Sequence, residues 1–427
     1  MTAPTLERRR LADLPELRRD PFDEGALEEA RDIVEDVRHR GVEAVRKHAE
    51  RLGDLESDEP LFIDPDGLER RAAEVDPEVE QLFRRTADRI RAFADAQREA
   101  LDDMETSIPG GRAGHDVAPV PSAGCYVPGG RYPLPSTALM TGETARTAGV
   151  EELWFAAPTD APAVCAAASI AGADGLINCG GAQAIAALAF GADRLPAADV
   201  VVGPGNRWVT AAKKLVAGRV EIDMLAGPSE LVVFADASAD PAVVAADLLA
   251  QAEHDPDALP VLVSTDGTVV DEVERALASQ LEDLPTAETA RAALDGGFAV
   301  TVDSVEEGVE ACDRIAPEHL ELLVDGAEEL ADRLRHYGSL FVGARAAEVL
   351  GDYGAGPNHT LPTGGAARST GGLSVFDFLR VRTWMRIDDA GAAESLIRDA
   401  ADFAEIESLE GHARSARRRL ETDDDSE

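Results

Sequence analysis

The stretch that decides the fold is residues 152–206, ELWFAAPTDAPAVCAAASIAGADGLINCGGAQAIAALAFGADRLPAADVVVGPGN. Apolar, strand-like runs (ELWFAAP, GLINC, ADVVVGPGN) alternate in it with runs of small residues that suit helices (APAVCAAASIAGA, AQAIAALAF). Alternation of this kind predicts a parallel β-sheet covered by helices on both faces.

The same alternation begins again at residue 230 and continues to residue 343, from ELVVFAD to SLFVG. Two similar α/β modules in tandem are the simplest interpretation. Residues 6–103 show apolar positions at helical spacing, SIPGGRAGHD (residues 107–116) breaks that pattern, and the charged tail from Thr383 also suits helices. The predicted fold class is therefore α/β, with helical extensions at both ends of the chain.

Charge is the most unusual feature of the composition. The 427 residues hold 82 Asp plus Glu and 41 Lys plus Arg, a formal net charge of −41. Because nucleic acids and anionic membranes attract cations, a surface this negative argues against both as partners. Only three of the cations are lysine, and the acid is spread along the chain, which is typical of a salt-adapted, halophilic surface.

Four cysteines, Cys125, Cys165, Cys179 and Cys312, have no metal-binding spacing and are predicted to be reduced core thiols. The N-terminus lacks the apolar stretch of a signal peptide, and no apolar run is long enough to span a bilayer. We therefore expect a cytoplasmic protein.

Several side chains are candidate metal ligands. Gln251 and His254 lie three apart on a predicted helix and would share a face, although a helical histidine is more often simply packed or solvated. Asp352 and His359 stand on GDYGAGPNHTLPT, a predicted loop, and His412 follows near the C-terminus. Imidazole, carboxylate and amide donors without a thiolate suit Zn²⁺, with Mn²⁺ or Co²⁺ as substitutes.

A candidate acid–base pair stands in RIAPEHLELLV. Pro317 restricts the backbone just before Glu318 and His319, which places the pair at a turn that enters a strand. A carboxylate and an imidazole side by side offer two proton acceptors of different basicity. The alternative is a plain surface pair.

Three Gly-rich turns, YVPGGRYP, CGGAQA and VVGPGN, each follow strand-like residues and could bring backbone N–H groups to a phosphate. None of them is the G-x-G-x-x-G fingerprint of dinucleotide-binding folds. Taken alone they are ordinary strand-to-helix turns.

Five motifs in fixed order closely resemble the histidinol dehydrogenase family, and the resemblance covers residues 20 to 415. The motifs are AGPSE, QAEHD, APEHLE, GDYGAGPNHTLPT and GLSVFDF. The resemblance implies two incomplete Rossmann-like domains, which accounts for the missing fingerprint. The implied divisions are an N-terminal arm (1–20), a first discontinuous α/β domain (20–125 and 230–380), a second α/β domain (126–229) and a helical tail (381–427).

The resemblance also implies a zinc-requiring homodimer that oxidises L-histidinol to L-histidine with two NAD⁺ in succession, the last steps of histidine biosynthesis. The matched metal ligands, one Zn²⁺ per subunit, are Gln251, His254 and Asp352, with His412 donated by the other subunit. Glu318 and His319 match the catalytic bases. The remaining matches are Ser229, His359 and Glu407 at the substrate, where the metal ligands and His319 also lie, and Tyr126, Gln183 and Asn206 along the NAD site.

One departure stands beside the predicted metal site, where Asp255 replaces the glycine usual in the family. It either raises metal affinity or faces solvent. Two other functions are compatible with these residues: a zinc hydrolase with Glu318 as base, which would form no NADH, and an acidic binding protein without cofactor or chelator sensitivity.

Overall fold

A computed structural model of the chain describes residues 5–14, 17–129 and 133–420. Its contacts divide the chain into two compact units. The first holds the described residues up to Ala96 together with Val120–Phe378, and the second holds Gln97–Pro119 and the described residues from Leu379 onward. The domain boundaries given above remain a prediction.

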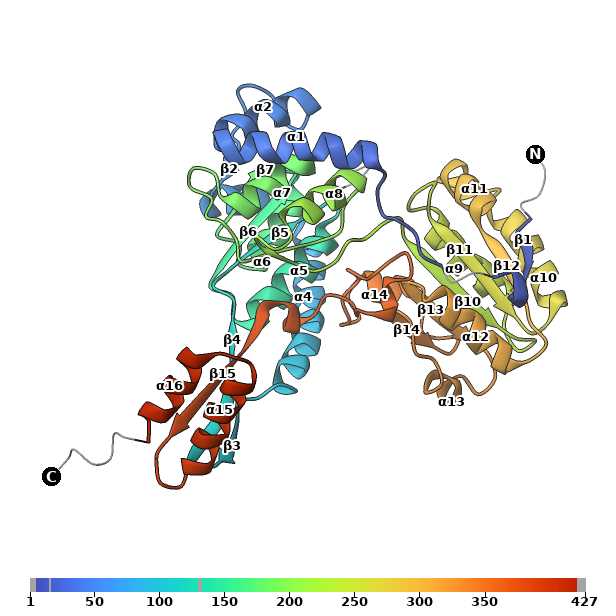
Figure 1. Ribbon diagram of the computed structural model, residues 1–427. Helices are drawn as coiled ribbons and strands as arrows, with labels where there is room; N and C mark the ends of the chain where they lie inside the picture. The colour runs from blue at the N-terminus through green and yellow to red at the C-terminus, as the bar shows by residue number, and fades with distance from the viewer. Residues whose placement is uncertain (1–4, 15–16, 130–132, 421–427) are drawn as a thin grey trace. The chain divides into compact units, whose positions relative to one another are not determined.

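The first unit contains a six-stranded sheet in which every neighbouring pair is parallel. Its order is β1 (Glu7–Arg10), β12 (Phe298–Thr301), β11 (Leu259–Ser264), β10 (Glu230–Ala235), β13 (His319–Leu323) and β14 (Ser339–Val342). The N-terminal strand β1 lies beside β12 at the sheet edge (Figure 1).

Helices cover both faces of this sheet because its central strands are apolar on both sides. On β10, Leu231 and Val233 pack into one cluster and Val232 and Phe234 into another. The first cluster includes α9 (Pro241–Ala252), α10 (Gly267–Gln280) and α11 (Ala287–Gly296), and the second includes α12 (Val305–Ile315) and α13 (Ala327–Ala331). This is the doubly covered parallel sheet that the alternation predicts.

The first unit contains a second six-stranded sheet, and three of its strands, β6, β7 and β8, come from residues 152–206. Its order is β2 (Phe62–Ile63), β7 (Gly175–Asn178), β6 (Glu152–Ala157), β5 (Ser122–Tyr126), β8 (Val200–Val202) and β9 (Glu221–Ile222). All pairs are parallel except β2 with β7. Two similar α/β modules are therefore present, as predicted.

Helices again cover both faces of the second sheet. Trp154 and Ala156 of β6 pack in a cluster with α7 (Gly181–Phe190) and α8 (Arg207–Val216), whereas Phe155 lies against Gly142 of α5 on the other side. That side holds α5 (Pro135–Ala148) and α6 (Pro162–Ile170), and α6 contacts α3 (Pro65–Ala72). The N-terminal helices α1 (Glu24–Arg40) and α2 (Val42–Leu52) lie on α7, and α1 also on α8 (Figure 1). The long helix α4 (Pro77–Glu99) follows.

The acid-rich composition supplies many helix starts. Asp23 caps α1 by accepting a hydrogen bond from Ala26 N at 2.7 Å, and Asp64, Asp240 and Asp266 cap α3, α9 and α10 in the same way. A carboxylate at this position satisfies an otherwise unpaired N–H and complements the helix dipole. Part of the acid therefore contributes to the fold and not only to solvation.

The second unit is an antiparallel three-stranded sheet, β15 (Leu379–Ile387), β4 (Gly111–Pro119) and β3 (Met104–Ile108), followed by α15 (Glu394–Ile406) and α16 (Glu410–Arg418). The predicted break of the helical pattern at SIPGGRAGHD is confirmed, because α4 ends at Glu99 and this segment forms the hairpin of β3 and β4. The prediction of helix from Thr383 is wrong at its start, because the chain is in β15 up to Ile387 and becomes helical only at Glu394.

The prediction of helix from Leu6 is likewise wrong at its start, because Glu7–Arg10 is β1. The sequence ERRR carries no alternation of apolar and polar residues, so it gives no local strand signal. Its backbone is ordered by pairing with β12, which is far away in the chain.

No helix among the described residues combines the length and apolarity that crossing a bilayer requires. The four cysteines are free and buried, which confirms them as reduced core thiols. Burial raises the pKa of the Cys125 thiol to about 12, so that side chain remains protonated.

Candidate active site

The predicted acid–base pair lies where expected, at the start of a buried strand. Helix α12 ends at Ile315, Ala316 takes the left-handed conformation with φ 52°, and Pro317 directs the chain into β13, which begins at His319. Glu318 and His319 are 6% and 4% exposed. They are thus not a surface pair, and two such polar side chains in a core require specific partners.

Those partners come from the amino end of the neighbouring strand β10. Glu318 Oε2 accepts a hydrogen bond from Glu230 N at 2.9 Å, and His319 Nδ1 lies 3.1 Å from Glu230 O. Glu318 Oε2 is 3.6 Å from His319 Nδ1. The pair therefore lies at the amino ends of parallel strands, opposite to the edge that ligands normally use in such sheets.

Burial shifts the pKa values of the pair in opposite directions. It raises the pKa of Glu318 well above its usual value and lowers the pKa of His319 to about 4, although the nearby Asp352 carboxylate partly opposes the shift of His319. His319 is therefore neutral near pH 7 and able to accept a proton.

A candidate metal centre adjoins this pair. One ligand atom each from His254, Glu348 and Asp352 lie within 4.8 Å of one another. His254 Nε2 is 4.0 Å from Asp352 Oδ2, and His319 Nε2 is 3.8 Å from Asp352 Oδ1. The structure thus brings the predicted residues His254, Asp352, Glu318 and His319 into one cluster.

Gln251 lies in the last turn of α9, which contacts α14 (Glu348–Asp352). Its side chain is fully buried, and neither amide atom has a hydrogen-bond partner among the described residues. A buried amide without a partner is costly, so an amide next to a metal centre is well suited to give its oxygen to an ion.

Two local predictions are wrong in detail. His254 does not share the helix of Gln251, because α9 ends at Ala252 and the Asp255-Pro256 step disfavours helical backbone beyond it. Asp352 is not on a loop but is the last residue of the short helix α14, which begins before the Gly-rich stretch.

Further carboxylates surround the cluster. Glu321 Oε1 accepts a hydrogen bond from Glu348 N at 2.6 Å, and no oxygen of the Glu230 or Glu348 carboxylates has a hydrogen-bond partner among the described residues. Burial raises the pKa of Glu230 to about 7, that of Glu321 to about 8 and that of Glu348 well above its usual value. Such a concentration of buried acid favours a bound cation, which would stabilise the ionised forms.

The predicted substrate residues are only partly gathered here. His359 Nδ1 lies 3.1 Å from Asp352 O and its Nε2 lies 3.3 Å from Thr137 Oγ1 of α5. Ser229 directly precedes β10. Glu407, just past the end of α15, and His412, on α16, belong to the second unit, and both are exposed.

All three predicted cofactor residues line one cavity of about 920 Å³. Tyr126 ends β5, Gln183 is in the first turn of α7 after β7, and Asn206 stands between β8 and α8. The cavity therefore lies at the carboxyl ends of parallel strands, the usual place for a dinucleotide in such a sheet. Gly181 N donates to the Tyr126 hydroxyl at 3.2 Å.

Sequence reasoning did not single out Glu348, Glu230, Glu321 or, at the cavity, Asp54. Glu230 begins the apolar strand β10 and Glu321 lies between leucines in β13, positions at which a carboxylate is unusual. Glu348 stands four residues before Asp352 on one helical face. Asp54 has no comparable local signal.

A model of the family described as "Histidinol dehydrogenase" matches residues 17–420. The chain belongs to the histidinol dehydrogenase family. The histidinol dehydrogenase of Parasynechococcus marenigrum is 45% identical over 394 residues, covering 91% of this chain and 90% of that protein. That of Haloarcula marismortui is 42% identical over 429 residues, covering 97% and 99%.

The fold is that of the family as well. The crystal structure of histidinol dehydrogenase from Elizabethkingia anophelis superposes with a TM-score of 0.91 at 30% identity and covers 98% of each chain. The match confirms the two Rossmann-like modules with their extensions and makes this chain an oxidoreductase of the histidinol dehydrogenase family.

Proposed function

We propose that this chain oxidises L-histidinol to L-histidine through histidinal, with NAD⁺ as hydride acceptor and a zinc ion in each subunit. The observation that carries the proposal is the buried Glu318–His319 pair, which lies against Asp352 in the His254–Glu348–Asp352 cluster, in a chain of this family. A zinc-dependent enzyme of this class needs two bases and a metal site side by side.

The donors present fit a zinc ion. Gln251, His254 and Asp352 would hold it, together with His412 of the partner subunit, and the amide of Gln251 has no other partner among the described residues. Bound zinc would supply two nitrogen-binding positions that anchor the imidazole and the amine of the substrate. Ser229, His359 and Glu407 are the proposed further contacts to the substrate.

The oxidation of an alcohol to an acid requires two hydride removals with addition of water between them. His319, neutral near pH 7, would accept the hydroxyl proton in the first step. Glu318 would accept a proton from the water that adds to the aldehyde. Burial of both side chains keeps bulk water away from the intermediate.

The cavity at the carboxyl ends of β5, β7 and β8 is the proposed NAD⁺ site. Tyr126 and Asn206 contribute a hydroxyl and an amide at its wall, and Gln183 contributes a buried amide oxygen that has no partner in the described chain. These groups can hydrogen-bond a dinucleotide without the glycine fingerprint.

The remaining proposals concern the setting of the enzyme. We propose a cytoplasmic homodimer. The net charge of −41 supports adaptation to high salt and argues against nucleic acid as a partner. The family resemblance supports the dimer with a metal site shared between subunits.

One assay tests the proposed function. The purified chain in molar salt is mixed with histidinol and NAD⁺, and NADH absorbance is followed with and without a chelator. We expect two NADH per histidinol and loss of activity on zinc removal. No NADH from histidinol in the zinc-loaded protein would refute the proposal.

A further inference from the structure

The walls of the cofactor cavity carry more acid than base. Glu29, Asp32 and Asp54 line it, and Arg51 is the single lysine or arginine among the described residues that do so. The pyrophosphate of a dinucleotide is anionic, so a cavity of this composition must provide a specific counter-charge or bind the cofactor poorly.

The usual counter-charge in such folds is the start of a helix after a strand, and at two of these starts, α7 and α8, oxygen atoms of the protein already accept hydrogen bonds from backbone N–H groups. Asp54 Oδ2 accepts hydrogen bonds from Gly180 N, the residue that precedes α7, and from Gln183 Nε2, each at 3.0 Å. At α8, Asn206 Oδ1 accepts from Trp208 N at 3.1 Å and from Val209 N at 3.2 Å. Three N–H groups that could otherwise receive a phosphate therefore bind oxygen atoms of the protein itself, and one of these oxygens belongs to a carboxylate.

Arg51, near the end of α2, is a cation whose charge is not paired with a carboxylate that the structure describes. It forms no ion pair with a carboxylate of the described residues, in a chain with 82 acidic residues. By contrast, Arg46 on the same helix pairs with Glu50, and Arg40 at the end of α1 pairs with Asp36 and Glu43.

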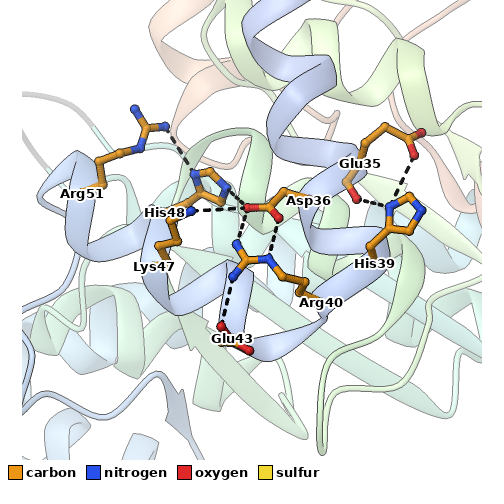
Figure 2. A network of polar contacts seen from close by, with 8 residues as sticks. All are labelled: Glu35, Asp36, His39, Arg40, Glu43, Lys47, His48 and Arg51. Carbon is orange, nitrogen blue, oxygen red and sulfur yellow. Dashed lines mark hydrogen bonds and ion pairs between the residues drawn. The ribbon is translucent and has the colours of Figure 1, made fainter.

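A chain of side chains fixes Arg51 instead (Figure 2). His48 Nε2 lies 2.8 Å from Asp36 Oδ2, and Arg51 Nη2 lies 3.3 Å from His48 Nδ1. The Asp36 carboxylate accepts hydrogen bonds from Arg40, which holds the pKa of Asp36 well below its usual value. Because an ionised carboxylate only accepts and a guanidinium only donates, His48 Nε2 donates to Asp36 and His48 Nδ1 accepts from Arg51.

We propose that Arg51 binds the pyrophosphate of the dinucleotide in this cavity, and that His48 and Asp36 are positioning residues that hold Arg51 toward it. The inference rests on the proposed use of NAD⁺. One N–H of the guanidinium contacts His48, so the other four remain for phosphate oxygens, which a planar guanidinium binds in pairs.

The test measures cofactor binding without catalysis. The zinc-loaded full chain is titrated with NAD⁺ and with ADP-ribose in the absence of histidinol, by calorimetry or by the fluorescence of Trp208, which lines the cavity. Arg51→Gln should raise both dissociation constants roughly ten- to a hundredfold at the lowest salt that keeps the protein folded, and Arg51→Lys should raise them less. The ratio to wild type should shrink toward molar KCl because salt screens the contact.

Arg46→Gln is the matched control, since it removes the same charge from the same helix at a residue outside the cavity. It should leave both constants unchanged. If Arg46→Gln and Arg51→Gln raised the dissociation constants equally, the loss of net charge would explain the effect and the inference would be overturned. Wild-type dissociation constants in the Arg51→Gln variant would overturn it as well.

Two further arms separate the alternatives. If Arg51 instead served a ribose phosphate, Arg51→Gln would weaken NADP⁺ and leave NAD⁺ unchanged, which also overturns the inference. If wild type bound no dinucleotide at all, the proposed function would fail and not merely the role of Arg51.

The positioning role has its own readout. His48→Phe keeps an aromatic ring at this position and removes its hydrogen bonds, so it should weaken NAD⁺ binding in the wild-type background and have no further effect in the Arg51→Gln background. Additive losses in the double variant would contradict the role of His48.

Discussion

His319 Nδ1 lies 3.1 Å from the backbone oxygen of Glu230, and this contact decides which nitrogen of His319 can act as a base. A carbonyl oxygen only accepts, so Nδ1 carries the hydrogen and Nε2 is left with its lone pair. Nε2 is buried, has no hydrogen-bond partner among the described residues, and faces Asp352 Oδ1 at 3.8 Å. A backbone group thus aims the proposed proton acceptor at the proposed metal centre.

The two bases should be separable by substitution. Glu318→Gln should largely spare oxidation of the alcohol and slow oxidation of added histidinal by about 10²–10⁴, because only the second step needs a proton taken from water. His319→Asn should slow the alcohol step by a similar factor. NADH formation is measured separately from histidinol and from histidinal in single turnovers, and equal losses in both steps for Glu318→Gln would refute the division of labour.

Glu348 should contribute to metal retention. Its carboxylate lies within 4.8 Å of ligand atoms of His254 and Asp352, so Glu348→Gln removes a charge that holds the ion and its ligands. We expect a roughly ten- to a hundredfold weaker zinc affinity, measured as zinc per chain after dialysis against a graded chelator.

Asp255→Asn provides the control for that experiment. Asp255 is exposed and accepts a hydrogen bond from Asp257 N at 2.8 Å. Of the two alternatives for this residue, metal affinity or solvent exposure, these contacts favour solvent exposure. Its zinc content should match wild type. Retention of zinc by Glu348→Gln equal to that of Asp255→Asn would show that Glu348 does not support the metal.

If the metal site is shared between two subunits, inactive variants should complement one another. His412→Asn and His254→Asn should each lose zinc and activity. Refolded together in equal amounts, they should form mixed dimers with one intact site, which restores about a quarter of wild-type activity. Absence of any recovery in mixed dimers that have formed would argue that the ligands do not cross.

Glu230 should make stability depend on pH in a predictable direction. Burial raises its pKa to about 7 from a usual 4.5, so the folded state binds the proton more tightly than the unfolded state. The contribution to stability is complete below pH 4.5 and is lost as pH rises through 7. Gln cannot ionise at this position. The free energy of unfolding of Glu230→Gln minus that of wild type should therefore increase from low to high pH, by at most about 3 kcal/mol.

Urea unfolding near pH 5 and near pH 8 in constant salt measures this gain. Glu328→Gln on α13 is the control, since Glu328 is exposed. A gain for Glu230→Gln that is the same at both pH values would mean that ionisation of Glu230 does not contribute.

Much of the fold could be predicted because its signals are local. Strands such as β10 and β6 are apolar after their first residue, as burial on both faces requires, and the helices that follow such strands show the apolar spacing of helices. The strands β1, β3 and β15 escaped prediction because they are polar or exposed and owe their order to distant partners.

The sequence by itself determined the α/β class, the family and the identity of Glu318, His319, Gln251, His254 and Asp352 as candidates, since these depend on residue order and on motifs of a few residues. Only the tertiary structure decided that Glu348 joins the metal cluster, that Glu230 O selects the basic nitrogen of His319, and that Asp54 occupies the start of α7. Each of these contacts joins different elements of the chain. No local pattern encodes them, because they exist only once packing has brought those elements together.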